Sequence, residues 1–314
     1  MKLLDSRYGG LLLLAAGLLL LPWLAGNAYL LDVANRIAIN AIIAVGLNLL
    51  IGYAGQISLG HAGFLGLGAY ASAILCGSYD WPAWLALLSA AAGVALLAFL
   101  VARPILRLKG HYLAMATLGL GMIVSLVLSN ESALTGGPDG MAVPGLVLFG
   151  WEPQGERAWY WIFATLLLLA IWLAQNLIDS PLGRALRAVH GSEVAARVAG
   201  VDTTACKVQV FVISAVFAAI AGSLSAHYTG FVTPGQASFL HSVELVTMVV
   251  IGGMASTYGA VLGAALMTLL PQLLSGLEDY EMLVFGLILM VSMIVLPQGL
   301  LPGLRGWLQT RRAA

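Results

Sequence analysis

Long uncharged stretches alternate along this chain with short segments that carry its charged residues. The stretches are 8–31, 37–79, 81–102, 110–130, 158–178, 208–277 (interrupted only by Glu244) and 282–304. A helix that crosses the hydrocarbon core of a membrane needs about 20 apolar residues. The pattern therefore predicts one crossing in most stretches, two in 37–79, and from two to about four in 208–277.

Basic residues decide how many helices cross in 208–277, because Lys and Arg favour the cytoplasmic side of a membrane. Lys2 places the N-terminus inside, and an odd number of crossings returns the basic tail 305–312 to that side. Three crossings fit the length best. We therefore expect an all-α integral membrane protein of about ten transmembrane helices with broken or re-entrant segments, both termini cytoplasmic. Residues 1–314 then form a single polytopic domain with a cytoplasmic loop at 179–207.

Composition supports a protein dissolved in lipid. Hydrophobic residues make up 61% of the chain and charged residues only 9%, against about a quarter charged in soluble domains. So few charges could not cover the surface of a soluble protein. This excludes a soluble enzyme, a disordered tail and an ordinary nucleic-acid binder. The two cysteines are too few for a disulfide scaffold or a Cys-only metal site.

The first stretch, 8–31, also has features of a secretory signal. It follows a basic start, has a Leu-rich middle and ends near the small residues Ala25, Gly26 and Ala28. An uncleaved anchor is favoured because the apolar run reaches Leu31 and is long enough to span.

Two glycine-rich zones predict interrupted helices. The zone 52–68 has six glycines in seventeen residues, and each glycine costs a helix about 1 kcal/mol relative to Ala. It predicts a turn beside a translocation path or a helix pair packed through small residues, and the two are compatible. Gln56, Ser58 and His61 are therefore candidate path residues, although His61 also fits a satisfied packing histidine. A second zone, 251–263, predicts a cytoplasmic turn and hints at an internal repeat.

Glu244 is the only carboxylate inside a long apolar stretch, which makes it a candidate for the path or its gate. The alternative is a helix-start residue at the interface, favoured by the helix dipole. His241 lies three residues earlier on the same helix face. No second carboxylate and histidine set accompanies the pair, so no metal site is expected.

The segment 179–207 predicts a short amphipathic helix outside the membrane. It has a serine that can cap the helix, an acid and a base four residues apart, two valines on one face and a glycine that can end it. The valines need a surface, which lipid headgroups or a cytoplasmic protein could provide. The residues concerned are Arg184, Arg187, Ser192, Glu193, Val194, Arg197, Val198 and Gly200.

Missing motifs narrow the function further. The chain has no P-loop, no H-E-x-x-H and no G-x-S-x-G, so we expect no catalytic and no cofactor-binding residues. A proton-coupled carrier needs ionisable groups within the membrane to bind and release protons, and this chain has a single candidate acid there. Transport driven by a separate ATPase is favoured, and an ion-coupled secondary transporter is the alternative.

Several motifs carry a family resemblance over residues 33–300. The run 40–70 with GQISLGH at 55–61 resembles the N-terminal signature of LivM-type permeases, which are inner-membrane subunits of bacterial ABC importers for branched-chain amino acids. Further matches are GHYLAMATL at 110–118, LTGGPDG at 134–140, SPLGRALR at 180–187, EVAARVAG at 193–200 and VIGGM at 250–254.

The resemblance implies that this is a multi-pass protein of the inner membrane, in contact with lipid and with no nucleic-acid partner. It implies that 193–200 is a coupling helix that seats in an ATP-hydrolysing subunit. Its partners would be a second, related permease, two ABC ATPases that use ATP, and a periplasmic binding protein. The substrate would be a branched-chain or other hydrophobic amino acid, moved by alternating access, although related permeases carry urea or short amides.

Overall fold

The computed structural model describes residues 9–24, 26–108, 110–147 and 150–274, with scattered positions between 283 and 303. The chain divides into two compact units: 1–48, 154–176 and 247–314 form the first, and 49–153 and 177–246 form the second.

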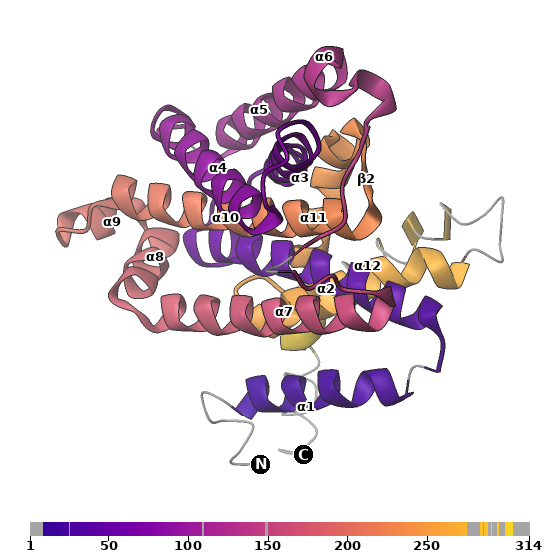
Figure 1. Ribbon diagram of the computed structural model, residues 1–314. Helices are drawn as coiled ribbons and strands as arrows, with labels where there is room; N and C mark the ends of the chain where they lie inside the picture. The colour runs from indigo at the N-terminus through magenta and orange to yellow at the C-terminus, as the bar shows by residue number, and fades with distance from the viewer. Residues whose placement is uncertain are drawn as a thin grey trace. The chain divides into compact units, whose positions relative to one another are not determined.

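Figure 1 shows an almost wholly helical chain. The α-helices are α1 (Gly9–Leu24), α2 (Ala28–Asn48), α3 (His61–Ser78), α4 (Ala83–Ile105), α5 (His111–Asn130), α6 (Ser132–Thr135), α7 (Gly155–Asp179), α8 (Pro181–Gly191), α9 (Glu193–Val198), α10 (Thr203–Thr229), α11 (Phe239–Gly252) and α12 (Thr257–Leu274). Between them lie a π-helical turn η1 (Leu49–Tyr53), two 3-10 turns, η2 (Gly137–Asp139) and η3 (Pro234–Ala237), and two short strands, β1 (Met141–Ala142) and β2 (Phe231–Val232).

Six of the described helices are long and apolar enough to cross a membrane. They are α2 with η1 (Ala28–Tyr53), α4, α5, α7, α10 and α12, and α1 and α11 are shorter apolar helices. Three helices, α10, α11 and α12, fill the described part of the 208–277 stretch. Only α10 and α12 are long enough to be candidate spans, so three crossings in this stretch stay a prediction. Only scattered residues of the predicted crossing in 282–304 are described. The all-α fold is thus confirmed, and the total of ten crossings stays a prediction.

The boundary between the first two predicted crossings is wrong. Asp32 and Arg36 were expected in the gap between helices, but α1 ends at Leu24 and α2 begins at Ala28. Both charged residues lie inside α2, where Arg36 Nε and Asp32 Oδ2 are 2.9 Å apart at i,i+4 spacing. Paired charges on one helix face are compatible with a helix end at the membrane surface. A gap between uncharged stretches therefore need not be a gap between helices.

The second unit has α3 and α10 at its centre in close contact, and the order of their paired residues shows that they run parallel. His61 Nε2 is 2.7 Å from Ser214 Oγ. About three turns further along α3, the Ser72 and Ser223 hydroxyls are 2.5 Å apart. Such polar contacts and small residues hold membrane helices together, since lipid offers no hydrophobic driving force between them.

Glycines set the close approach of α3 and α10. A Cβ added to Gly222 would lie 2.1 Å from the Leu65 carbonyl oxygen, and one added to Gly68 would lie 2.2 Å from that of Ala219. Only a residue without a side chain leaves room for these backbones, so the helices cannot be this close with any larger residue at either position.

Gly222→Ala is expected to destabilise the protein by about 1–3 kcal/mol, because the new methyl group forces two packed backbones apart. Gly93→Ala in α4 is the matched control: an added Cβ there meets nothing within 4 Å, and Ala favours a helix. Thermal unfolding in detergent, followed by size-exclusion chromatography, measures both. Equal midpoints for the two variants would contradict the assigned close contact.

The first unit joins α2 to α12 and α1 to α7 through side-chain hydrogen bonds. Asn40 Nδ2 donates to Thr268 Oγ1 at 3.0 Å, and the Tyr160 hydroxyl donates to the Leu18 carbonyl oxygen at 2.7 Å. A turn in 251–263 is confirmed, since α11 ends at Gly252 and α12 begins at Thr257, and its cytoplasmic position stays a prediction. It is a tight connection between two helices.

Candidate functional site

The first interrupted helix lies where the glycine-rich zone predicts it. After η1 the chain is non-helical over 55–60 before α3 begins at His61. A Cβ on Gly55 would lie 3.4 Å from the His190 ring at the end of α8. His61, by contrast, contacts Ser214, which is 11 residues after Thr203 at the start of α10, or about 16 Å along that helix. The segment 55–60 therefore runs from the α8 end of α10 to a level well inside the span.

One part of this zone interrupts the helix, and another part packs through small residues. The break is confined to a few residues, while Gly66 and Gly68 lie within α3 and give it close contacts. The zone thus combines an interruption with a small-residue packing surface.

His61 is a fully buried histidine whose two ring nitrogens both have partners. Nδ1 is 2.9 Å from Ser58 Oγ, and Nε2 is 2.7 Å from Ser214 Oγ. The ring also meets the edges of Phe64 and Phe211. These contacts fit the packing role that the sequence left open, because a histidine with two satisfied nitrogens in an apolar cage joins three segments rigidly.

A second interrupted helix, which the sequence analysis did not place, follows α10. After Thr229 the chain forms β2, which pairs antiparallel with β1, and then η3 before α11 begins at Phe239. The signal was present as Thr-Pro-Gly at 233–235, three residues typical of a turn. Residues 230–238 are thus a further non-α-helical segment of the second unit.

The two interruptions bring the starts of α3 and α11 together. The Ala62 backbone N–H donates to Ser242 Oγ at 3.1 Å, and the Leu59 N–H donates to Thr117 Oγ1 of α5 at 3.0 Å. Two helix starts and α5 meet at one point deep in the second unit. Ser242 and Thr117 are the residues of this junction that sequence reasoning missed.

Glu244 lies at the depth of this junction and is exposed. It follows Ser242 by two residues, which places it within about 3 Å of that level along α11. α10 has 27 residues, or about 40 Å, so a hydrocarbon core of about 30 Å centred on it includes this level. The Glu244 side chain is 53% exposed, and Oε2 is 3.0 Å from Nδ1 of His241 on the same face. An exposed acid at this depth is too costly to face lipid.

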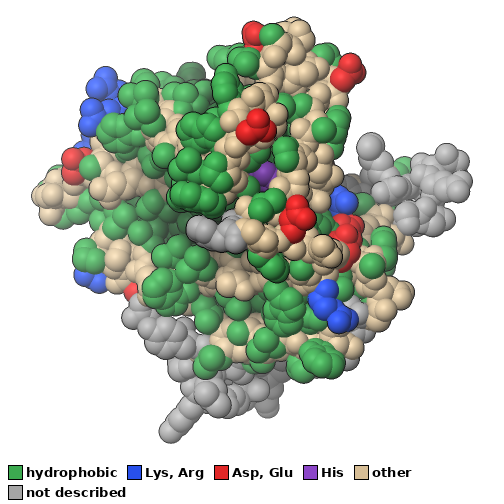
Figure 2. Space-filling model, in the orientation of Figure 1, with side chains coloured by type: hydrophobic (Ala, Val, Ile, Leu, Met, Phe, Trp, Pro, Cys, Tyr) green, Lys and Arg blue, Asp and Glu red, His purple; other side chains and the backbone are tan. Residues whose placement is uncertain are grey.

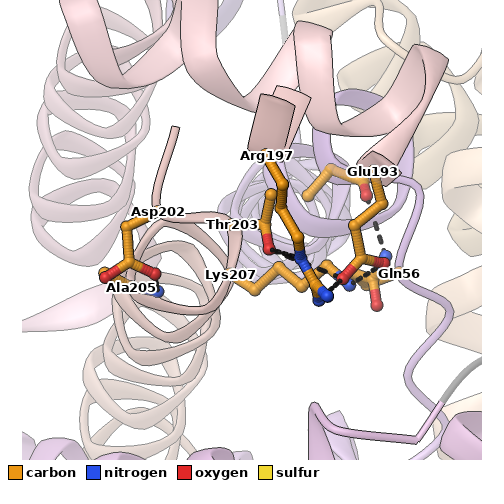
Figure 3. A network of polar contacts seen from close by, with 8 residues as sticks. Gln56, Glu193, Arg197, Asp202, Thr203, Ala205 and Lys207 are labelled. Carbon is orange, nitrogen blue, oxygen red and sulfur yellow. Dashed lines mark hydrogen bonds and ion pairs between the residues drawn. The ribbon is translucent and has the colours of Figure 1, made fainter. Parts of the chain in front are cut away.

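The predicted path residues therefore separate into three places. Ser58 and His61 lie together in the junction, and Glu244 faces outward from α11 beside it. Gln56 is half-buried and bonds through Nε2 to the Ala54 carbonyl oxygen at 3.0 Å, at the α8 end of the interruption. Figure 3 draws Gln56 beside Glu193.

The segment 179–207 forms two short helices instead of the single one expected. α8 precedes α9 and was not predicted. Ser180 caps α8 by accepting from the Gly183 N–H at 3.3 Å. Arg184 and Arg187 both turn back to the end of α7, where each donates to a backbone carbonyl oxygen at 3.1 Å. Arginines in this position satisfy the last carbonyls of a helix.

α9 has the capping that its sequence predicts. Ser192 Oγ accepts from the Ala195 N–H at 3.3 Å, and Gly200 has a φ of +84° just beyond the helix end. Asp202 caps α10 by accepting from the Ala205 N–H at 3.0 Å. The chain between two spans is thus held by its own local hydrogen bonds.

An ion-pair network joins α9 to the start of α10 (Figure 3). Lys207 Nζ is 2.8 Å from Glu193 Oε2, and the Lys207 side chain is only 3% exposed. Arg197 Nη2 is 2.5 Å from Glu193 Oε1, and its Nε donates to Thr203 Oγ1 at 3.0 Å. Glu193 is therefore turned toward α10 and away from solvent.

The two valines of α9 point away from the chain. Val194 is 69% exposed and Val198 is 86% exposed. They have the same spacing as the Glu193–Arg197 pair but lie outside that network. α9 therefore offers another molecule two exposed apolar side chains beside the partly exposed Arg197. Among the described residues no group of three His, Cys, Asp or Glu side chains is arranged to hold a metal ion.

Six apolar spans and two interruptions that meet at membrane depth define a helical membrane permease. The family model described as "Branched-chain amino acid transport system / permease component" matches residues 29–293. The chain belongs to this family, and no solved structure matches it.

Three curated relatives show the range of the similarity. The high-affinity branched-chain amino acid transport system permease LivM of Salmonella typhimurium is 35% identical, over 89% of this chain and 72% of that protein. The corresponding LivH permease of Escherichia coli is 28% identical over 63% of this chain and 66% of that protein. The ribose import permease RbsC of Escherichia coli is 27% identical over 85% of this chain and 84% of that protein.

Family membership confirms the resemblance seen in the motifs. The chain is a permease subunit of an ABC importer and not an enzyme, and it is a multi-pass protein of the inner membrane. Relatives of both the LivM and the LivH type are permeases of the same named transport system.

Proposed function

We propose that this permease carries branched-chain or other hydrophobic amino acids from the periplasm to the cytoplasm. The observation that supports the substrate is the 35% identity to LivM over 89% of the chain. The ribose permease shares the scaffold at lower identity, so the scaffold alone does not select an amino acid. Urea or a short amide is the alternative cargo within the family.

In this proposal the chain has protein partners in the complete importer and is surrounded by lipid. A second homologous permease completes the membrane part, two ABC ATPases bind and hydrolyse ATP, a periplasmic binding protein delivers the substrate, and lipid surrounds the spans. Residues 1–314 act as one polytopic permease domain with about ten crossings, and both termini and the segment 179–207 lie in the cytoplasm. This chain needs no cofactor of its own.

Coupling to the ATPase runs through α9 in this proposal. Val194 and Val198 seat in a partner ATPase, and the Glu193–Lys207 ion pair passes the movement of α9 to α10. α10 and α3 move together because close backbone contacts and hydrogen bonds join them, including that of Ser214 with His61. The start of α3 shifts with them. The moving segments are supported by Gln56, Ser58, Gly200, Arg184 and Arg187. Their movement opens the path to one side of the membrane and then to the other, which is alternating access.

The path passes the face of α11 that carries His241 and Glu244. The observation behind this assignment is an exposed acid at membrane depth, where a water-filled path or a second permease is a tolerable neighbour and lipid is not. A carboxylate there can bind the ammonium group of a passing amino acid.

Glu244→Gln is expected to lower uptake at least about tenfold, because a hydrogen bond to a charged group contributes about 1.5–3 kcal/mol. The measurement is ATP-dependent uptake of labelled leucine by the assembled importer in proteoliposomes. Glu131→Gln, at the end of α5, is the matched control and should leave uptake unchanged. Full uptake by Glu244→Gln would make the residue an ordinary helix-start residue.

Reconstitution tests the substrate and the energy source together. Proteoliposomes with the two permeases, the ATPases and the binding protein should take up leucine, isoleucine and valine with ATP, and should not take up urea or ribose. Uptake by this chain alone under a Na⁺ or H⁺ gradient would instead establish an ion-coupled carrier. ATP-dependent uptake of urea alone would establish the amide branch of the family.

A further inference from the structure

A basic groove lies at the end of α4, and of the residues described above it includes only the capping pair Asp202 and Ala205. Its volume is about 370 Å³, and it opens between the last turns of α4 and the first turn of α10. α4 and α10 pack along each other in the second unit (Figure 1). The lining residues are Phe99, Arg103, Arg107, Asp202, Thr204, Ala205, Val208 and Gln209.

Two arginines give the groove its charge. Arg103 lies in the last turn of α4 and Arg107 in the turn that follows the helix, and both line the groove. The Arg103 guanidinium lies 5.0 Å from the centroid of the Phe99 ring, which holds it in place. In the described part of the chain neither guanidinium makes an ion pair. Figure 2 shows basic side chains at the end of α4, at the upper left.

The acid in the groove is already in use. Asp202 Oδ1 accepts from the Ala205 N–H as the cap of α10. One capping carboxylate beside two arginines leaves a net positive groove, so its occupant should be an anion.

The position of the groove identifies the kind of anion. α4 and α10 both belong to the candidate spans, so the shared end of the two helices lies at the membrane surface whichever way the chain is oriented. Leu96 and Leu100 are exposed large apolar side chains on α4. Leu100 is three residues before Arg103 and Leu96 is four residues before Leu100, so the two leucines continue the side of Arg103 toward the membrane interior. One stripe thus changes from apolar to basic as it reaches the surface.

We propose that the groove binds the phosphate of an anionic phospholipid, such as phosphatidylglycerol, with its acyl chains along Leu96 and Leu100. The two guanidinium groups supply several N–H donors to the phosphodiester. Basic pockets between transmembrane helices bind anionic headgroups for the same reason. A free phosphate would gain nothing from the apolar part of the stripe. The proposal does not depend on which substrate the permease carries.

The test compares lipid affinities of the purified full-length chain by native mass spectrometry. Micelles are doped with phosphatidylglycerol or with phosphatidylethanolamine of the same acyl chains. Arg103→Gln with Arg107→Gln should lower the affinity for phosphatidylglycerol about 30-fold, since each basic residue contributes about 1 kcal/mol and 1.4 kcal/mol is tenfold. The affinity for phosphatidylethanolamine should not change. Arg103→Lys with Arg107→Lys should retain most of the binding, because it keeps both charges.

Arg36→Gln with Arg157→Gln is the matched control, because it removes the same charge elsewhere and should change the affinity less than about twofold. Both changed residues of the test variant are exposed, and elution volume and thermal midpoint check its fold. If it does not fold, Arg107→Gln alone should lower the affinity about fivefold. Equal affinity in wild type and variant overturns the proposal, and so does an equal loss in the control. Displacement of the lipid by millimolar inorganic phosphate would show a soluble-anion site instead.

Discussion

Replacing Val194 and Val198 together by glutamate is expected to abolish assembly with the ATPase and with it all ATP-dependent uptake. The two side chains are largely exposed in the chain itself, so the fold loses no packing when they change. In a complex they would be buried, and two unpaired charges taken out of water cost several kcal/mol each. Affinity for the ATPase should fall at least about 100-fold.

Co-purification of the ATPase with a tagged permease measures this loss, and leucine uptake in proteoliposomes confirms it. Val194→Ala with Val198→Ala should give an intermediate loss, because it removes apolar area without adding charge. Val147→Glu, in an exposed loop of the same unit, is the control for an added charge. Undiminished co-purification of the double glutamate variant would contradict docking of α9 on the ATPase. The valines would then contact lipid headgroups, the other surface that the sequence allows.

Lys207→Met is expected to uncouple ATP hydrolysis from transport. Lys207 is almost completely buried, and its Nζ is 2.8 Å from Glu193 Oε2. Its replacement by Met leaves Glu193 paired with the exposed Arg197 of its own helix, so the buried ion pair between α9 and α10 is lost. α9 then keeps its valines for the ATPase but loses its firm connection to α10. Hydrolysis should continue while uptake falls at least about tenfold.

The number of ATP molecules hydrolysed per amino acid imported is the decisive measurement, because a merely less stable permease lowers both rates together. The exchange Glu193→Lys with Lys207→Glu should restore much of the coupling. Arg197→Gln removes only the exposed partner of Glu193 and should have a much smaller effect, since exposed ion pairs contribute about 0–1 kcal/mol. An unchanged ratio in Lys207→Met would place the connection elsewhere.

The caps of α9 and α10 and the helices of the 208–277 stretch could be predicted because each depends on neighbours in the sequence. Ser192 and Asp202 bond to N–H groups three residues away, and hydropathy and positive charge act on each segment separately. The interruption at 230–238 was missed because it is short and apolar on both sides. The 70-residue stretch was defined by its lack of charged residues, and this criterion does not detect uncharged turn residues such as Thr-Pro-Gly.

Depth and orientation of side chains could not be read from the sequence. His61 and Ser214 are 153 positions apart, and only the parallel packing of α3 on α10 places them together. The sequence did not predict that Glu193 bonds to Lys207 or that Arg184 bonds to the Asp179 carbonyl oxygen, and the coupling role of both residues stays a prediction. Which way a charged side chain points depends on the residues packed beside it.

The sequence by itself determined that this chain is a helical membrane protein, where most of its helices lie and which family it belongs to. Apolar length, capping residues and contiguous motifs carry that information locally. The tertiary structure decided that two interrupted helices meet at one depth, that Glu244 is exposed there and that α9 presents its valines. These features arise from close contacts between segments far apart in the chain, where glycine, serine and buried charge fix the separation and orientation of the helices.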